Sequence, residues 1–346
     1  MSAITVLGEM EAEALGVTLP HEHLLLDLRN QYAEPADPDR RRLGLRKVCP
    51  ETVAAVRRDP YALRDNLLLD DVELAAAEVQ RFREAGGQTV VDCTTRGIGP
   101  RPGDLATISR RTGVQVIAGC GYYTQDTHPA DLADRPVGQI ADEIVRDLTE
   151  GIDGTGIQAG VIGELGTSRE IHPRERKVLR AAARAFAQVP RAIYVHTYPW
   201  GREGLKAARL LIDEGVDAGR VVICHVDVSP DVEYLRALLS LGVVIEFDNF
   251  GKEFEPDTSD DGFAGGAFAT DAERVKTLAA CLEWGFADRV LITTDICLKC
   301  MLGAYGGEGY AHILRNVVPT LRAAGFSATD VDRLLVENPR RVLAGG

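Results

Sequence analysis

The stretch AIYVHTYPWGREGLKAARLLIDEGVDAGRVVICH, residues 192–225, decides the fold. It begins and ends with short apolar runs, AIYVH and VVICH, and each run closes on a histidine, His196 or His225. Between them, residues 202–214 carry apolar side chains at helical spacing. A continuous apolar run is typical of a strand buried on both faces, as in a parallel sheet. The stretch therefore predicts a strand–helix–strand unit in which both histidines lie at the same edge of the sheet.

The same pattern recurs along the chain. Eight such strand-like runs are GVTLPH (16–21), TVVDC (89–93), VQVIAG (114–119), AGVIGE (159–164), AIYVH (192–196), VVICH (221–225), VVIEFD (243–248) and VLITTD (290–295). Helices are expected over 71–85, 136–150, 173–188, 202–214, 230–240 and 270–284. Strands that alternate with helices in this way predict an α/β fold, a (β/α)8 TIM barrel, with 1–346 as a single domain. The segments 313–325 and 329–344 predict the last helix and an extra C-terminal helix. A doubly wound open sheet is the competing fold, but polar residues at the ends of five runs favour closure.

Composition restricts the possible partners. The chain has 346 residues, of which 45% are hydrophobic and 26% charged, the balance of a globular protein with a substantial core. A net charge of −13 argues against binding to nucleic acid or to an anionic membrane surface. Seven irregularly spaced cysteines are typical of reduced thiols in a cytoplasmic protein. No secretory signal or membrane span is recognisable. We therefore expect a cytoplasmic protein whose partner is a small-molecule substrate.

Three long connections follow strands, so all three are expected on the same face of the barrel. They are residues 27–70, 249–269 and 296–310. The first contains a basic segment, 40–64, which we interpret as a solvated or subunit-facing surface that could also steer an anionic substrate. Long loops on this face commonly form lids and specificity elements.

Metal-capable side chains stand near the downstream ends of the strand-like runs. They are His21, His23, Glu164, His196, His225 and Asp295. In a parallel barrel the strand ends meet at one mouth, so side chains far apart in sequence can surround a metal ion. Residues at positions i and i+2 of a strand point the same way, so His21 and His23 can bind together while Glu22 points away. An alternative for each histidine alone is a buried side chain satisfied by one carbonyl.

Glu164 is the most informative member of this set. Its neighbours are apolar or glycine, so an ionised carboxylate at this position needs a compensating charge. Two divalent ions would contribute +4, against −3 from Glu164, Asp295 and a bridging hydroxide. The remaining positive charge would favour an oxyanion on the substrate. We therefore expect a carboxylate that bridges two metal ions.

Several motifs together carry a resemblance to a known family. They are TLPHEHL (18–24), RRDPYALRDNL (57–67), IGELG (162–166), the strand ends VHT and CHV, the final TD, YGGEGYAHILRNVVP (305–319) and ENP (337–339). As a set they resemble the phosphotriesterase family of the amidohydrolase superfamily. The resemblance is closest to its phosphotriesterase-related (phosphotriesterase homology) protein branch.

The resemblance implies a barrel with two divalent metal ions per chain, zinc first and manganese or cobalt as alternatives, often in a homodimer. It assigns the ligands as His21, His23 and Asp295 for the buried ion, His196 and His225 for the exposed ion, and Glu164 as the bridge. Two departures matter. The best-known organophosphate- and lactone-hydrolysing members bridge their metals with a carboxylated lysine where this chain has a glutamate. Many lactonases carry DRYG where this chain has DNFG (248–251), which argues against an acyl-homoserine lactone as substrate.

Candidate substrate-binding residues come from the loops. Tyr123 matches a tyrosine that in lactonase relatives leans over the metals and contacts the substrate, so it is also a catalytic candidate. Asn249 stands in the DNFG motif, and Cys297, Lys299 and Tyr305 lie in the eighth loop. The alternatives are a rim aromatic for Tyr123 and a merely exposed lysine for Lys299.

These residues predict a binuclear metal-dependent hydrolase. A bridging hydroxide would attack a carbonyl or phosphoryl centre, and Asp295 would accept the proton and pass it to the leaving group. We expect a carboxyl ester or lactone as substrate, with possible side activity on phosphotriesters. The alternative is an amidohydrolase that cleaves an N-acyl amino-acid-like amide. Two further alternatives are a mononuclear deaminase-like barrel and a non-catalytic small-molecule-binding barrel.

Overall fold

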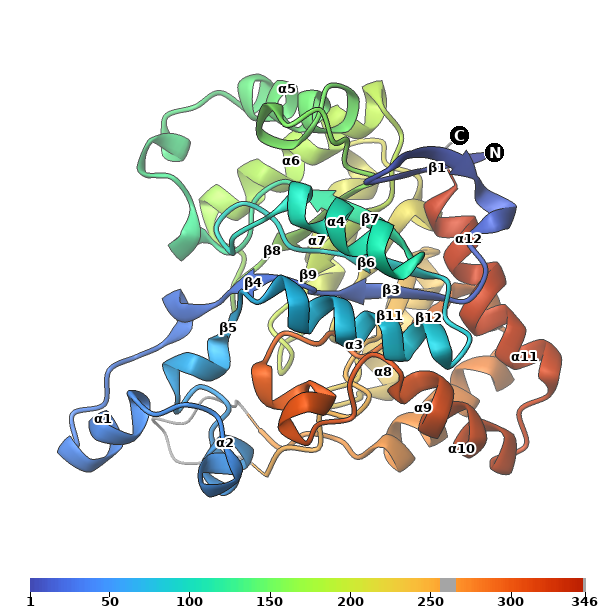
Figure 1. Ribbon diagram of the computed structural model, residues 1–346. Helices are drawn as coiled ribbons and strands as arrows, with labels where there is room; N and C mark the ends of the chain where they lie inside the picture. Colours follow the sequence, from blue (N-terminus) through green and yellow to red (C-terminus); the bar gives the residue numbers. More distant parts are fainter. Residues whose placement is uncertain (256–265, 345–346) are drawn as a thin grey trace.

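The computed structural model describes residues 1–255 and 266–344, and its centre is a barrel of eight parallel strands (Figure 1). The strands are β3 (Thr18–Glu22), β6 (Thr89–Asp92), β7 (Gln115–Cys120), β8 (Val161–Gly166), β9 (Ile193–His196), β10 (Val221–Ile223), β11 (Val244–Phe247) and β12 (Val290–Ile292). Each pairs with its neighbours in sequence order from β3 to β12. The predicted TIM barrel is confirmed, and every expected apolar run overlaps one strand.

Helices surround the barrel between successive strands. They are α3 (Val72–Glu84), α4 (Pro102–Thr112), α5 (Val137–Thr149), α6 (Pro173–Gln188), α7 (Gly204–Asp213), α8 (Val232–Leu241) and α9 (Asp271–Glu283). Helix α4 was not predicted, although it begins with Pro102 and ends at Gly113, whose φ of 68° suits glycine. None of the helices in the described residues combines the length and apolar character that a membrane crossing needs.

The C-terminal segment forms the expected last helix and extra helix, each interrupted. The α-helical parts are α10 (Val318–Ala323), α11 (Ala328–Asp332) and α12 (Asn338–Leu343), with π-helical segments at Ile313–Val317 and Arg333–Glu337. Both π segments lie just before a proline, Pro319 or Pro339. Because proline has no N–H to donate to the preceding turn, the helix widens there rather than closing a regular α turn.

The loop over residues 27–70 carries its own small elements. Strand β4 (Leu26–Asp27) pairs with β5 (Leu68–Leu69), and between them lie α1 (Pro38–Gly44) and α2 (Val53–Arg58). An unpredicted antiparallel hairpin, β1 (Ser2–Thr5) and β2 (Gly8–Glu11), precedes the barrel. Short 3-10 turns occupy Ala12–Ala14, Arg29–Gln31, Pro50–Thr52, Arg64–Leu67, Gln125–Thr127, Ala130–Ala133, Ile152–Gly154, Ala218–Arg220, Ala287–Arg289, Lys299–Met301 and Gly303–Tyr305. Of the expected loop 249–269, residues 256–265 lie outside the described residues.

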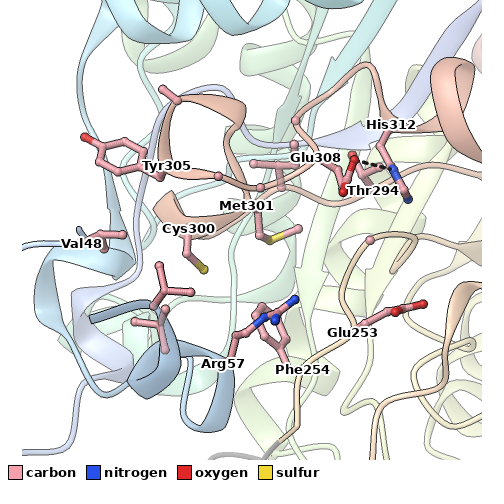
Figure 2. Close-up of a pocket in the computed structure, with 18 of the residues that line it drawn as sticks. Val48, Arg57, Glu253, Phe254, Thr294, Cys300, Met301, Tyr305, Glu308 and His312 are labelled. Carbon is pink, nitrogen blue, oxygen red and sulfur yellow. Dashed lines mark ion pairs between the residues drawn. The ribbon is translucent and has the colours of Figure 1, made fainter. Parts of the chain in front are cut away.

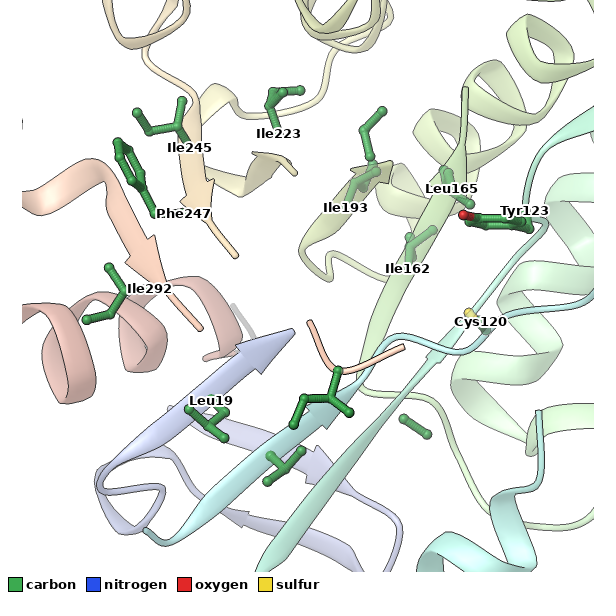
Figure 3. Close-up of a cluster of buried hydrophobic side chains, with 14 of the residues drawn as sticks. Leu19, Cys120, Tyr123, Ile162, Leu165, Ile193, Ile223, Ile245, Phe247 and Ile292 are labelled. Atoms are coloured by element: carbon green, nitrogen blue, oxygen red, sulfur yellow. The ribbon is translucent and has the colours of Figure 1, made fainter. Parts of the chain in front are cut away.

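Alternate strand residues form two apolar layers. Figure 3 shows members of the larger layer, which strands all around the barrel contribute and which includes residues of the surrounding helices. The opposite face of the strands supplies a second cluster with Tyr194, Val222 and Leu291, and the terminal segments add Ala3 and Leu343 to it. The chain ends therefore help to close the end of the barrel interior that lies away from the strand C-termini, and polar side chains gather at the opposite mouth.

A side chain, rather than a backbone ladder, joins the two ends of the sheet. Within the described part of the chain no ladder connects β12 to β3. Instead the buried Glu22 carboxylate accepts hydrogen bonds from the Thr293 and Thr294 hydroxyls and from the backbone N–H groups of Thr294 and Ile296, at 2.5–2.9 Å. The Thr293 hydroxyl also donates to the carbonyl of His21 at 3.1 Å. Glu22 thus points away from the histidine pair, as predicted, and its hydrogen bonds connect β3 to the residues that follow β12.

Candidate metal centre

Glu164 lies at the centre of four imidazoles at the barrel mouth. Its Oε2 atom is 3.1 Å from Nδ1 of His196, 3.3 Å from Nε2 of His225 and 3.6 Å from Nε2 of His21. Its Oε1 atom is 3.4 Å from Nε2 of His23. Strands β3, β8 and β9 and the end of β10 therefore bring these five side chains together, although the first and the last are 204 positions apart in the sequence.

Asp295 completes the cluster from the end of β12. Its Oδ1 atom lies 3.3 Å from Nε2 of His23 and 3.8 Å from Nε2 of His21. Its Oδ2 atom forms an ion pair with the ammonium of Lys252, a buried residue that the sequence analysis did not single out. Burial alone would lower the pKa of Lys252, but the Asp295 carboxylate raises it above its ordinary value. Lys252 is therefore charged at neutral pH.

Two cluster residues have left-handed backbone conformations. His225 has φ 62° and Asp295 has φ 42°, and each follows the last residues of its strand. This conformation costs a non-glycine residue roughly 1–2 kcal/mol, because Cβ approaches the carbonyl oxygen. Such outliers concentrate at functional sites, where the surrounding structure holds them. Here they turn both side chains toward the cluster.

Hydrogen bonds on the far side of the rings orient three of the histidines. Nδ1 of His21 lies 2.9 Å from Oε2 of Glu246, and Nδ1 of His225 lies 3.0 Å from Oδ2 of Asp248. Nδ1 of His23 lies 2.8 Å from the hydroxyl of a threonine, Thr94. A partner on one ring nitrogen fixes which nitrogen faces the cluster, which is the usual arrangement behind metal-ligating histidines.

The environment sets the protonation of the imidazoles. Burial lowers the pKa of His21 and of His196, so both rings are neutral near pH 7 and can offer a lone pair. Burial also acts to lower the pKa of His23, but Asp295 and Glu164 raise it to about 10. The surplus of carboxylates therefore attracts positive charge to this site.

The donor set fits a divalent metal. Nε2 of His21 is buried and has no hydrogen-bond partner among residues 1–255 and 266–344, although it faces Glu164 and Asp295. Two groups of ligand atoms, each within 4.8 Å of one another, share Glu164: one with His21 and His23, the other with His196 and His225. Imidazole nitrogens and carboxylate oxygens in such groups suit zinc and related divalent ions.

Sequence reasoning missed three charged residues here, for different reasons. Glu246 lies inside an apolar run, the same signal that drew attention to Glu164, so it could have been found. Asp248 ends its run in the position that Asp295 occupies in another, which is the same kind of signal. Lys252 follows in a loop, and nothing in its local sequence indicates that its ammonium reaches Asp295.

A cavity of about 470 Å³ opens above the cluster. Its walls include six aromatic side chains: Tyr61, Tyr123, Tyr198, Trp200, Phe254 and Phe268. Three predicted substrate-binding residues, Tyr123, Asn249 and Cys297, line it. The Tyr123 hydroxyl lies 3.3 Å from Nδ1 of His196, and burial raises the pKa of this tyrosine, so it keeps its proton. The Asn249 amide nitrogen already donates to Asp227 at 2.7 Å.

The structure places Lys299 and Tyr305 away from this cavity. Nζ of Lys299 lies 2.9 Å from Oδ1 of Asp65 and 5.9 Å from the Tyr305 ring centroid. Tyr305 instead lines a separate cavity of about 1130 Å³ with Cys300 and Met301 (Figure 2). The eighth loop therefore divides its side chains between two cavities, a division that residue types alone do not reveal.

Comparisons with known proteins agree with this arrangement. The family model for the phosphotriesterase family matches residues 1–343. An N-acetyltaurine hydrolase from Danio rerio is 36% identical over 344 residues, which cover 98% of this chain and 97% of the relative. A phosphotriesterase-related protein from Nematostella vectensis is 33% identical over 345 residues, again 98% of this chain and 97% of the relative.

Solved structures give the same result. A resiniferatoxin-binding protein from Rhodobacter sphaeroides superposes with a TM-score of 0.95 at 38% identity, covering 99% of this chain and 94% of that one. A phosphotriesterase homology protein from Escherichia coli, complexed with phosphate in its active site, gives 0.78 at 31% identity, with 96% and 99% covered. A mutant of a phosphotriesterase-like lactonase from Deinococcus radiodurans gives a TM-score of 0.76 at 30% identity, with 99% and 100% covered.

The fold and the cluster are those of a metal-dependent barrel hydrolase. The chain belongs to the phosphotriesterase family, and the predicted resemblance, including that to its phosphotriesterase-related branch, is confirmed.

Proposed function

We propose that this protein is a metal-dependent hydrolase that cleaves the amide bond of a small N-acyl amino-acid-like compound. The observation that carries the hydrolytic proposal is the Glu164 carboxylate within 3.1–3.6 Å of four imidazole nitrogens, beneath a cavity large enough for a small molecule. The N-acetyltaurine hydrolases at 36% identity over nearly the whole chain support an amide rather than an ester.

Charge balance supports two divalent ions. The buried carboxylates at the mouth include those of Glu164, Glu246, Asp248 and Asp295, and the Lys252 ammonium forms an ion pair with Asp295. Their sum is −3 with all four carboxylates ionised. Burial raises the pKa of Glu246 well above its ordinary value and that of Asp248 to about 7, so full ionisation would need added positive charge nearby. Two divalent ions would change the sum to +1, the sign that favours an attacking anion and a developing oxyanion. Zinc fits the donor set, and manganese and cobalt are alternatives. We propose His21, His23 and Asp295 as ligands of one ion, His196 and His225 as ligands of the other, and Glu164 as the bridge.

The roles of the protein groups follow from their positions. Bound dications would lower the pKa of a water molecule and polarise the substrate carbonyl. Asp295 reaches the cluster with one carboxylate oxygen. We therefore propose that it accepts the proton of the nucleophile and then donates this proton to the leaving nitrogen. The Tyr123 hydroxyl, protonated beside His196, can donate a hydrogen bond to the oxygen of the substrate carbonyl.

A second candidate function is hydrolysis of a lactone or another carboxyl ester. The Deinococcus radiodurans lactonase, at 30% identity over 99% of this chain, favours it, since the same machinery attacks either carbonyl. The absence of arginine from the DNFG motif weighs against an acyl-homoserine lactone.

The test is a comparison of substrate classes with zinc-, manganese- and cobalt-loaded protein. We expect the highest kcat/KM for N-acyl amino acids and N-acyl aminosulfonates, lower values for lactones and the lowest for phosphotriesters. A lactone preferred by tenfold or more would replace the amide assignment. If the protein retained no metal after loading and hydrolysed none of these compounds, the result would favour a non-catalytic barrel that binds a small molecule.

A further inference from the structure

One arginine and one lysine line the active-site cavity among the residues that the structure describes, and they differ in environment. Arg169 is exposed at the mouth, where its guanidinium donates to the Tyr198 hydroxyl at 3.2 Å and lies 5.1 Å from the centroid of the same ring. Lys252 is 5% exposed and lies on the floor of the cavity, next to Asp295. A buried ammonium interacts far more strongly with a nearby charge than an exposed guanidinium does.

The backbone holds Lys252 firmly in this position. Its own N–H donates to the carbonyl of Asn249 at 3.0 Å, and the preceding residue, Gly251, donates its N–H to Oδ1 of Asp271 at 2.9 Å. Arg274, which is fully buried, donates to the Lys252 carbonyl at 3.5 Å. These hydrogen bonds attach the loop to helix α9, and this attachment holds the Lys252 ammonium next to the cluster.

The Lys252 ammonium has unused hydrogen-bonding capacity. An ammonium carries three N–H donors. In the part of the chain that the structure describes, Lys252 Nζ has one acceptor, Oδ2 of Asp295. Buried donors are nearly always satisfied in proteins, by water or by a ligand where the protein supplies no acceptor. Because Lys252 lines the cavity, its remaining donors are available to a bound molecule.

The distance from the cluster limits where an acceptor can lie on the substrate. The Asp295 carboxylate touches Lys252 with Oδ2, while its Oδ1 lies 3.3 Å from Nε2 of His23. One carboxylate group therefore separates the ammonium from the reaction centre. An anion bound to Lys252 would stand only a few bonds from the carbonyl that is attacked. A long spacer would instead carry the anion out toward Arg169.

We propose that Lys252 is a specificity-determining residue that binds the anionic group of the leaving portion of the substrate. The preferred substrates are N-acyl compounds whose carboxylate or sulfonate lies two or three atoms from the amide nitrogen. This inference rests on the proposed amide hydrolysis. The competing role for Lys252 is purely structural, a cation that neutralises and positions Asp295.

The test uses metal-loaded protein and three substrates: N-acetyltaurine, its neutral counterpart N-acetylethanolamine, and N-acetyl-6-aminohexanoate with a longer spacer. The variants are K252M, which keeps an unbranched side chain without charge, K252R, which keeps the charge, and R169M. Lys276→Met, on the exposed face of α9, is the matched control for loss of a positive charge. Metal content is measured for every variant, and rates are compared at equal loading.

We expect K252M to raise KM for N-acetyltaurine about 30-fold, the scale of one hydrogen bond to a charged group. Because K252M also removes the cation beside Asp295, we expect kcat to fall for every substrate, so the informative quantity is a ratio. The kcat/KM ratio of N-acetyltaurine to N-acetylethanolamine should fall about 30-fold, whereas that of the long-spacer substrate to N-acetylethanolamine should change only slightly. K252R should recover part of the preference for the anion. A readout independent of turnover is calorimetric binding of taurine, the product amine, which K252M should weaken by a similar factor.

Equal losses for the anionic and neutral substrates would overturn the proposal and leave Lys252 as a positioning residue for Asp295. Loss of the anion preference in R169M but not in K252M would overturn it too, because the anion would then bind at the mouth. Failure of the proposed function looks different: wild-type protein would hydrolyse neither amide. The taurine titrations would then still decide whether Lys252 binds an anion.

Discussion

Nδ1 of His21 lies 2.9 Å from Oε2 of Glu246, and both side chains are fully buried. The contact leaves Nε2 of His21, which has no hydrogen-bond partner among the described residues, to face Glu164 and Asp295. Glu246 therefore acts on the cluster through the orientation of one imidazole rather than by direct contact.

Replacing Glu246 with Leu should weaken metal binding about 10- to 100-fold, the usual effect of losing the hydrogen-bond partner of a ligating histidine. Glu246→Gln should cost less, because the amide oxygen can still accept from Nδ1. Competition with a coloured chelator measures the affinity, and the absorption bands of cobalt-loaded protein report the ligand geometry. Glu150→Gln, at an exposed position after α5, is the control. Unchanged affinity and bands in both Glu246 variants would mean that His21 needs no such partner.

Replacing Glu164 with Gln should reduce the metal content from about two ions per chain to about one and remove most of the activity. The reason is that an amide cannot bridge two cations as a carboxylate does, and it supplies no negative charge to balance them. Elemental analysis after dialysis measures the ratio. About one ion per chain in both wild type and variant, with equal rates, would favour a mononuclear site.

Asp295→Asn should lower turnover at least about a hundredfold, the scale of a lost general base. The substitution also removes the negative charge beside Lys252, so metal content has to be measured along with the rate. The informative comparison is kcat at full metal loading. A rate near that of wild type under those conditions would exclude Asp295 as the proton acceptor.

Asp271 links the stability of the Lys252 loop to pH. Burial alone would raise the pKa of Asp271, but hydrogen bonds from His312 at 2.7 Å and from the Gly251 N–H, with the nearby Arg274, hold it below its ordinary value. A lowered pKa in the folded state stabilises the protein above the pKa of the unfolded carboxyl, about 3.9, and this contribution is lost as the pH falls through the lower folded value.

Asp271→Asn should therefore reduce the free energy of unfolding by about 1–2 kcal/mol at neutral pH. The difference from wild type should persist at pH 5 and shrink below about pH 4. Urea denaturation of metal-free protein at several pH values measures it without interference from metal release. A difference that stayed constant down to pH 3 would show that the effect does not come from ionisation of Asp271.

Most of the barrel could be predicted because its strands are buried on both faces and so appear as unbroken apolar runs. Helix α4 was missed because Arg101, Pro102 and Gly103 at its start are typical of a loop, whereas tertiary packing of Leu105 and Ile108 stabilises the helix. The strands of the hairpin β1–β2, SAIT and GEME, have four residues each and are too short to give a strong strand signal.

The cluster was easier to predict than the cavity above it. All six metal-capable side chains lie within a strand or within three residues after one, and barrel closure brings strand ends together whatever the loops do. The loop residues depend on the path of each loop. Cys297 faces the cavity, whereas Lys299, two positions later, turns to Asp65 because a 3-10 turn begins there. Lys252 could not be recognised for the same reason.

A metal ion bound at the junction of β12 and β3 would also affect the stability of the barrel. His21 and His23 stand on one side of that join and Asp295 on the other, so a cation shared among them would fasten the first strand to the last. Removal of the ion would then cause local unfolding first at the junction of β12 and β3. Supply of the metal in the cell would thereby govern how long the enzyme survives proteolysis as well as how fast it works.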